Sequence, residues 1–224
     1  MAFRPNNYPG IDLPKQFDME TKSNKAIVAE FYKYIIKERN ETLIDTYVHE
    51  DYIQHSPGGK DGREGLREMI NFLKTLPIPV PEQSPVKLIM ADDDMVVGVL
   101  SFTFMSKKML VVDLFRLRDG KVAEHWDAVQ EISVEKEIDV IYIGTGTALL
   151  ENKKLIEAAY QQQNTKIHRI FGEGDLILVQ AEIKKDAKRI ARYDILRIKE
   201  NQTTLCLSIQ QPVPDIMMHS NGIF

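Results

Sequence analysis

The segment DLFRLRDGKVAEHWD, residues 113–127, is the most informative part of the sequence about the fold. The segment divides at Asp119-Gly120, a pair typical of the tight turn between two antiparallel strands. On either side, apolar and polar residues alternate with the period of a half-buried strand. The segment therefore predicts a β-hairpin, whose register decides which side chains share a face.

Segments before this hairpin have a helical pattern. Apolar residues recur at three- and four-residue spacing from Ser23, after Asn40 and after Asp61, which predicts three helices. The Asp61-x-x-Glu64 spacing resembles a capping box. The period then changes to two, and strands are expected at residues 86–90, 95–104, 109–118 and 121–130. Helices followed by a run of strands indicate the α+β class with an antiparallel sheet.

The second half repeats the first at an offset of 81 residues. The match needs no gap from Val86 to Ile132, and it places Asp113 on Asp194. Agreement in register over four strands predicts a tandem duplication. The expected elements of this half are a strand at 140–143, a helix from about 149 to 162, and strands at 165–169, 176–183, 190–198 and 203–211.

The two copies differ in length. We expect the second to have no counterpart of the helix at 23–39 and little of the helix after Asn40, and therefore to be a truncated lobe. The expected domains are an N-terminal arm at 1–21, a complete domain at 22–132, a linker at 133–139 and a truncated, degenerate copy at 140–224.

Composition excludes several functional classes. The chain has 224 residues, 43% of them hydrophobic, and its 29 basic and 33 acidic residues give a net charge of −4. This mild acidity argues against nucleic-acid binding, which needs a basic surface. No apolar run reaches the ~18 residues of a membrane span. Cys206 is the single cysteine, so no disulfide framework is expected and a cytoplasmic location is favoured.

Four residues of the first half are candidates for acid–base chemistry: His55, Asp113, His125 and Asp127. A two-residue turn would place Asp113 opposite Trp126, on the face away from the other candidates. A three-residue turn with a bulge would place it opposite His125. We favour the three-residue turn because it places on one face of the hairpin a set of apolar residues together with the three polar ones. These residues are Val111, Asp113, Phe115, Leu117, Ala123, His125 and Asp127.

An apolar face with three converging polar groups is typical of a small-molecule pocket. Its walls would be Val111, Phe115 and Leu117. Burial raises the pKa of a carboxyl group and a nearby imidazolium lowers it, so the two carboxyls can hold different protonation states, as general acid–base catalysis requires. The residues also have structural interpretations: His125 completes a buried network, Asp113 is framework, and His55 is a solvated loop residue.

Other sites have little support in the sequence. No short-range ligand motif indicates a metal site, and we expect no metal. The chain also has no Gly-rich phosphate loop, serine nucleophile elbow or HExxH motif.

Segments at 52–57, 62–65 and 113–127, together with Gln130, resemble the SnoaL-like polyketide cyclases of the NTF2-like superfamily. The resemblance covers about residues 22–132, and the second half resembles the partner lobe of tandem members. It implies a cone-shaped α+β barrel around a pocket and a cofactor-free reaction, which in the cyclases is an intramolecular aldol closure. The family's acid/base aspartate maps onto Asp127, with Asp113 and His125 as pocket partners.

The leading hypothesis is thus a cofactor-independent cyclase, isomerase or hydrolase acting on a small, largely apolar carbonyl compound, such as a polyketide-like molecule. His55 would contribute a hydrogen bond at the pocket mouth. The alternative is a non-catalytic protein that binds a small ligand in the same pocket. At the offset of 81, residues 124–127 become Leu205-Cys206-Leu207-Ser208, so the site is expected in the N-terminal lobe.

The other face of the predicted sheet is also apolar. It carries Leu110, Val112, Leu114 and Trp126, and such a surface needs covering. We expect the second lobe to cover it as an intramolecular pseudo-dimer, and a homo-oligomer stays open.

Overall fold

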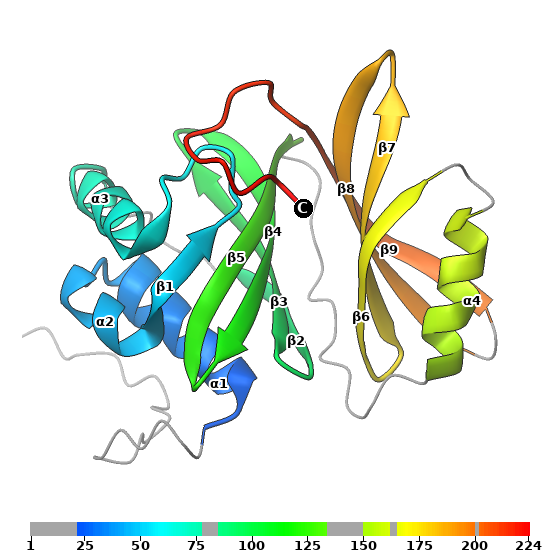
Figure 1. The fold of residues 1–224 in the computed structure, drawn as a ribbon, viewed down its shortest axis with the longest axis horizontal. Helices are drawn as coiled ribbons and strands as arrows, with labels where there is room; N and C mark the ends of the chain where they lie inside the picture. Colours follow the sequence, from blue (N-terminus) through cyan, green and yellow to red (C-terminus); the bar gives the residue numbers. More distant parts are fainter. Residues whose placement is uncertain (1–21, 78–84, 134–149, 162–164, 200–201) are drawn as a thin grey trace, which may run out of the picture.

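The computed structural model describes residues 22–77, 85–133, 150–161, 165–199 and 202–224. Two sheets stand side by side, and helical segments of the described chain cover the outer side of each, several on the first sheet and one on the second (Figure 1). The expected N-terminal arm, most of the linker and the strand at 140–143 lie outside the described residues. None of the described helices has the length and apolar character needed to cross a bilayer.

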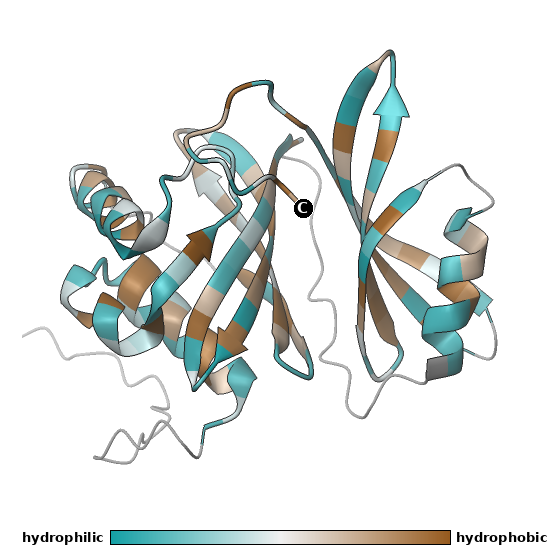
Figure 2. Ribbon diagram, in the orientation of Figure 1, coloured by the Kyte–Doolittle hydropathy of each residue, from teal (hydrophilic) through white to brown (hydrophobic). Residues whose placement is uncertain are grey.

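The first sheet has five strands in the order β1-β5-β4-β3-β2. Neighbouring strands are antiparallel except β1, which runs parallel to β5, so the sheet is mixed where we expected it to be purely antiparallel. Figure 2 shows hydrophobic and hydrophilic residues alternating along the strands, as the sequence pattern predicted. The bounds are β1 Val48–Gln54, β2 Val86–Asp92, β3 Met95–Phe104, β4 Lys107–Arg118 and β5 Lys121–Ile132.

Helices cover one face of this sheet and form a core with it. Ser23 caps the first helix by accepting a hydrogen bond from the Ala26 N–H, and Asn40 caps the second helical segment. Asp61 lies at the N-cap of the third, but its carboxylate accepts from Gln54 N instead, so the expected capping box is wrong. The bounds are α1 Asn24–Glu30, the π-helical η2 Phe31–Lys37, the 3-10 turn η3 Glu41–Leu43, α2 Ile44–Tyr47 and α3 Gly62–Lys74.

The second sheet has four strands in the order β6-β7-β8-β9, with one helix against its outer face. Adding 81 to the bounds of β3 and β4 gives those of β7 and β8 without a difference. This repetition of strand bounds supports the tandem duplication. The bounds are α4 Leu150–Gln161, β6 Lys166–Glu173, β7 Leu176–Lys185, β8 Lys188–Lys199 and β9 Gln202–Pro212.

Helix α4 occupies the place that α1 and η2 have in the first lobe. Tyr160 of α4 donates a hydrogen bond to Asp194, just as Tyr32 of η2 donates to Asp113. Ile156, one turn before Tyr160, packs on the equivalent sheet positions. Our expectation that the second copy lacks the first helix is therefore wrong. The described part of this lobe has no counterpart of α2, β1 and α3.

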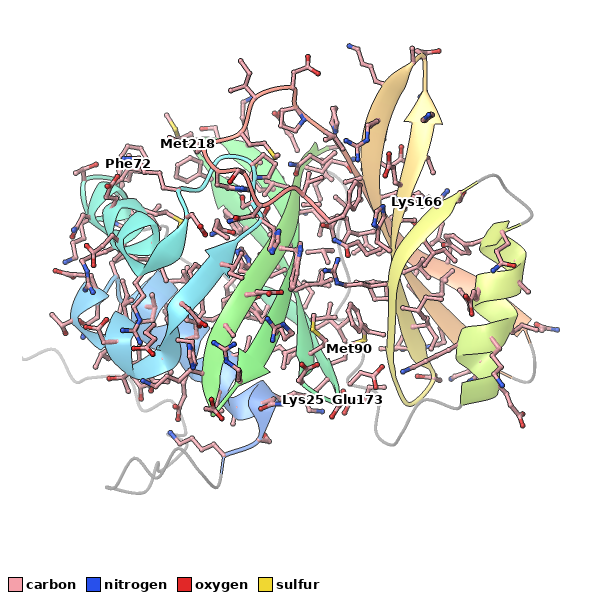
Figure 3. All side chains as sticks on the ribbon, in the orientation of Figure 1. Lys25, Phe72, Met90, Lys166, Glu173 and Met218 are labelled. Atoms are coloured by element: carbon pink, nitrogen blue, oxygen red, sulfur yellow. The ribbon has the colours of Figure 1, made fainter. Side chains whose placement is uncertain are left out.

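The two sheets pack face to face through one buried cluster. Leu110, Val112, Leu114 and Trp126 share this cluster with residues of β7, β8 and β9. At the lower end of the interface in Figure 3, Lys25 of the first lobe is ion-paired with Glu173 of the second.

Hydrogen bonds across the interface are reciprocal under the offset of 81. Gln211 Oε1 accepts from Val129 N at 2.8 Å, and Gln130 Oε1 accepts from Gln210 N at 3.1 Å. A second pair of bonds has the same relation, with Glu173 accepting from Ala91 N and Asp92 from Gly172 N, both at 2.9 Å. Contacts used once in each direction are the mark of a two-fold interface. They support the proposal that the lobes form an intramolecular pseudo-dimer.

Candidate active site

Three of the four predicted polar residues meet on the helix-covered face of the first sheet. Asp113 of β4 is paired with Asp127 of β5, and His125 lies two pairs further along, opposite Phe115 and on the same face. One ligand-type atom from each of Asp113, His125 and Asp127 lies within 4.8 Å of the other two. These three residues are called the polar cluster below.

The hairpin that carries the cluster differs from the one we favoured. Its turn has two residues, Asp119-Gly120, with φ angles of 51° and 69°, as a type I′ turn requires. A bulge at Ala123 then shifts the register by one residue. Because the bulge compensates for the shorter turn, Asp113 still shares a face with His125, although Asp127 is its direct partner. Asp113, His125 and Asp127 share one face as predicted, whereas the predicted turn, the predicted pairing and the place of Ala123 on that face are wrong.

The predicted pocket walls lie in the core between this face and the helices. Val111, Phe115 and Leu117 are all buried in one core cluster, which also includes residues of α1 and η2. The Phe115 ring stacks on His125 with centroids 4.8 Å apart. Val122 belongs to this core, whereas Ala123 lies in the bulge and takes no part in it. Contact of these walls with a substrate stays a prediction.

Asp113 is held from two sides. Its Oδ1 lies 3.1 Å from His125 Nε2, and its Oδ2 accepts a hydrogen bond of 2.6 Å from the Tyr32 hydroxyl. Gly98 lies opposite Asp113 on β3, and a Cβ there would come within 2.1 Å of the Tyr32 oxygen. The glycine therefore makes room for Tyr32. Both carboxylate oxygens of Asp113 are engaged, which suits a positioning role.

His125 is fixed through both ring nitrogens. Its Nδ1 lies 3.0 Å from Gln54 Oε1, an oxygen that only accepts, so Nδ1 carries a proton. The same oxygen accepts from the backbone N–H groups of His55 and Ser56, which fixes the orientation of the amide. Burial lowers the pKa of His125, but its bond to Asp113 and the carboxylate charges outweigh this and raise the pKa above its usual value. The protonated ring is thus more stable here than in a free histidine.

Asp127 is the member of the cluster with free bonding capacity. Its Oδ1 is buried and has no hydrogen-bond partner among the described residues. Burial and the charge of Asp113 raise the pKa of Asp127 above its usual value, although His125 and a hydrogen bond from the Ser56 side chain act in the opposite direction. A buried carboxyl group with a raised pKa and a free oxygen is suited to take up and return a proton.

Tyr52 of β1 adds a hydroxyl group to this environment. It accepts a hydrogen bond of 3.0 Å from Gln54 Nε2. Burial and the charges of Asp127 and Asp113 raise its pKa well above the usual value, so the phenol keeps its proton. Within the part of the chain that the structure describes, no acceptor takes that proton. Tyr52 is therefore available as a hydrogen-bond donor.

His55 does not join the polar cluster. It follows Gln54, and successive side chains of an extended segment point to opposite faces. Its ring stacks on Trp126 with centroids 4.5 Å apart, and its Nδ1 lies 2.9 Å from Gly222 O. The expected position of His55 at the pocket mouth is wrong, and its contacts lie on the side of the sheet that faces the second lobe.

Sequence reasoning missed three residues that hold the cluster: Tyr32, Tyr52 and Gln54. Tyr52 and Gln54 alternate with His55 in the quoted segment 52–57, and recognising β1 as a strand would have placed both on the cluster's face. No local signal marks Tyr32, because its contact with Asp113 depends on how η2 packs on the sheet.

The polar cluster also has the residue types of a metal site, but its bonding suits proton transfer better. Both oxygens of Asp113 and both nitrogens of His125 already have protein partners. Only Asp127 keeps a free ligand atom, and a metal site needs several. The donor set thus fits a metal poorly.

The second lobe keeps the framework of the site without its chemistry. Asp194 lies opposite Ser208, at the positions equivalent to the paired carboxylates. Leu205 occupies the pairing position of the site histidine, and Cys206, which the offset had placed there, lies in a bulge. The equivalent face therefore has neither the histidine nor the second carboxylate.

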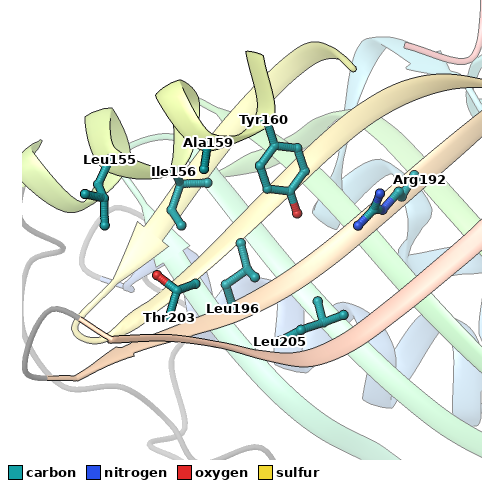
Figure 4. Close-up of a pocket in the computed structure, with 8 residues that line it drawn as sticks. All are labelled: Leu155, Ile156, Ala159, Tyr160, Arg192, Leu196, Thr203 and Leu205. Atoms are coloured by element: carbon teal, nitrogen blue, oxygen red, sulfur yellow. The ribbon is translucent and has the colours of Figure 1, made fainter. Parts of the chain in front are cut away.

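A shallow pocket of about 210 Å³ lies on this second face, between α4, β8 and β9 (Figure 4). Its polar groups include Tyr160 and Arg192, and both are bound to Asp194. Neither is a free acid or base, so this pocket does not compete with the polar cluster as an active site. The lining residues are Leu155, Ile156, Ala159, Tyr160, Arg192, Leu196, Thr203 and Leu205.

Together, the fold and the cluster define an NTF2-like α+β protein with an Asp–His–Asp site on the inner face of its curved sheet. The chain belongs to the SnoaL-like polyketide cyclase family, whose model matches residues 26–138. This match confirms the family that the sequence resembled. It covers the first lobe, while the second lobe lies outside it.

Solved structures resemble about half of the chain. IdmH from Streptomyces antibioticus is 21% identical over 48% of this chain and 93% of its own, with a TM-score of 0.39. TsrD from Streptomyces laurentii is 19% identical over 49% and 92%, with a TM-score of 0.39. A SnoaL-like polyketide cyclase from Agrobacterium tumefaciens is 13% identical over 51% and 97%, with a TM-score of 0.40. The comparison with curated proteins gave no match.

Proposed function

We propose that the first lobe is a cofactor-independent acid–base catalyst of the cyclase or isomerase type, acting on a small, largely apolar carbonyl compound. The observation that carries this proposal is the buried Oδ1 of Asp127, which has no hydrogen-bond partner in the described residues. In cyclase and isomerase chemistry of this kind, the protein's part is to remove a proton and to return it, which such a carboxylate can do. The adjacent Phe115 suits an apolar substrate.

In the proposed reaction, the Asp127 carboxylate removes a proton from the carbon next to the substrate carbonyl. The electron pair of the C–H bond moves into the enolate, whose oxygen receives a hydrogen bond from Tyr52. In an isomerisation, Asp127 then returns the proton to a carbon of the enolate. In a ring closure, the enolate carbon first attacks a second carbonyl group of the substrate, which forms the new C–C bond and moves the C=O electron pair onto oxygen, and Asp127 gives its proton to that alkoxide. His125 lowers the pKa of Asp127 and so opposes the rise that burial and Asp113 cause, and Asp113 holds the imidazole in place.

Proton exchange in D2O tests this function without knowledge of the product. NMR follows loss of the α-proton signal from a panel of cyclic ketones and β-keto esters. Wild-type protein should accelerate exchange for at least one compound, and Asp127→Asn should reduce the acceleration by about 100-fold or more. Ser208→Ala, at the equivalent position of the second lobe, should match the wild type. Undiminished exchange in a folded Asp127→Asn variant would reject the proposal.

The non-catalytic alternative makes a different prediction for the same proteins. If the polar cluster serves only for recognition, wild-type protein should retain a small molecule through purification and accelerate no exchange. Mass spectrometry of the released ligand would identify it. Asp127→Asn should then alter its affinity while no rate changes.

A further inference from the structure

The C-terminal segment, residues 213–224, follows the last strand of the second lobe but returns to the first. In Figure 1 it leaves β9 and crosses the top of the molecule toward the loop after β1. Ile223 is buried in the cluster between the two sheets. The Phe224 ring stacks on His168 with centroids 3.8 Å apart. The segment is thus packed against both lobes.

Its polar groups bind four consecutive residues of the first lobe. This stretch, residues 54–57, is called the site loop below. The four contacts are Asn221 Nδ2 to Gln54 O at 3.0 Å, Gly222 O to His55 Nδ1 at 2.9 Å, His219 Nε2 to Ser56 O at 2.9 Å, and Met218 N to Pro57 O at 3.3 Å.

On the side away from the C-terminal segment, the site loop contacts the polar cluster. Gln54 Oε1 accepts from His125 Nδ1, and the Ser56 side chain bonds to Asp127. His55 N donates to His125 O at 2.9 Å. One layer of residues therefore separates the C-terminal segment from the groups that would move the proton.

We propose that the C-terminal segment of the second lobe is a positioning element for the active site of the first, with His219 and Asn221 holding the site loop in the shape that His125 and Asp127 need. Neither residue touches the polar cluster, so both act through Gln54 and Ser56. The inference rests on the proposed function, since it takes Asp127 as the reacting group. It gives the second lobe a part in the chemistry although that lobe carries no acid–base set of its own.

Release of the site loop has a measurable consequence at His125. The groups that face its ring are the Asp113 and Asp127 carboxylates, the Gln54 amide and the Phe115 ring. Without Gln54 Oε1, the protonated ring has an unpaired Nδ1–H, whereas the neutral ring can change its tautomer. The pKa of His125 should therefore fall when the loop moves.

An NMR titration of the full chain with 15N-labelled histidine tests this proposal. In the double variant His219→Ala/Asn221→Ala, the titration midpoint of His125 should fall by about one pH unit, the size expected for losing a charge-assisted hydrogen bond. His219→Gln keeps an N–H donor at similar reach and should restore the wild-type midpoint when combined with native Asn221. Ser220→Ala, an exposed change on the same segment, is the matched control.

A wild-type midpoint in the folded double variant would overturn the proposal, even if the variant melted at a lower temperature. If the double variant does not fold, Asn221→Ala alone is measured, with hydrogen exchange at the His55 and Ser56 amides as the second readout. Both amides should exchange faster, and unchanged protection would also overturn the proposal. The titration needs no substrate. The two proposals can therefore fail separately. If the His125 midpoint shifts in the double variant but Asp127→Asn still catalyses proton exchange in the substrate at the wild-type rate, the proposed function is rejected and the positioning role is retained.

Discussion

Replacing Asp127 by asparagine should stabilise the fold at neutral pH while it abolishes proton transfer. The carboxylate is buried, and its Oδ1 finds no hydrogen-bond partner in the described ranges. A buried polar group left unpaired costs about 1–3 kcal/mol. Asparagine has nearly the same shape without the charge, and its carbonyl oxygen can still accept from Ser56.

The charges around Asp127 act on it in opposite directions. The ligand atoms of the polar cluster lie within 4.8 Å of one another, where a unit charge contributes about 3.5 kcal/mol at an effective dielectric constant of about 20. Attraction to His125 and repulsion from Asp113 are therefore similar in size and largely cancel. The burial cost remains, so Asp127→Asn should raise the free energy of unfolding by about 1–2 kcal/mol.

This gain should depend on pH. Burial, the largest cause, raises the pKa of Asp127 above its value in the unfolded chain. A group with a higher pKa in the folded state favours folding at low pH, and that contribution is lost as the pH rises through the folded pKa. The advantage of asparagine should thus be present at neutral pH and shrink toward about pH 4, the unfolded value.

Urea unfolding at a series of pH values measures the difference directly. Ser208→Ala is the control at the equivalent position, and its difference from the wild type should not vary with pH. An Asp127→Asn variant less stable than the wild type at pH 7 would refute the reasoning. A gain of constant size across the pH range would do the same.

Two further pairs of variants test the residues that support the polar cluster. Gly98→Ala would push a Cβ against the Tyr32 hydroxyl and should lower the free energy of unfolding by about 1–3 kcal/mol in thermal melts, whereas Gly58→Ala, with open space around it, should change it by less than about 0.5 kcal/mol. Tyr32→Phe and Tyr160→Phe should each cost about 1.5–3 kcal/mol through a lost hydrogen bond to a buried carboxylate. Only Tyr32→Phe should slow proton exchange, and equal slowing by both would contradict the assignment of the site to the first lobe.

The strands could be predicted where strand-forming apolar residues dominate, and not where polar residues interrupt them. The range 95–104 was predicted to the residue, because both faces of β3 pack in a core and the strand is a nearly continuous apolar run. β1 was missed, since His49, Glu50 and Asp51 interrupt the alternation and the strand follows directly on α2. The parallel pairing of β1 with β5 depends on long-range contacts, which the local sequence pattern does not predict.

The site was predicted in part for a related physical reason. The polar residues of β4 and β5 could be assigned to one face from strand periodicity, but the bulge at Ala123 has no mark in the sequence. The favoured turn was therefore wrong even though the face was right. Tyr32, and the C-terminal residues that hold the site loop, contact the site only through long-range packing. No local pattern could have found them.

The two faces of each sheet have different packing partners, and this difference explains which residues the two copies have in common. The inter-sheet contacts are reciprocal, so a position such as Gln130 and its counterpart Gln211 serve the same interface from both sides. A change in either copy would break one half of a matched pair. The inner face has no such constraint, because each lobe packs it against its own helices. The second copy could therefore lose the counterparts of His125 and Asp127 while it kept the outer face that holds the first lobe.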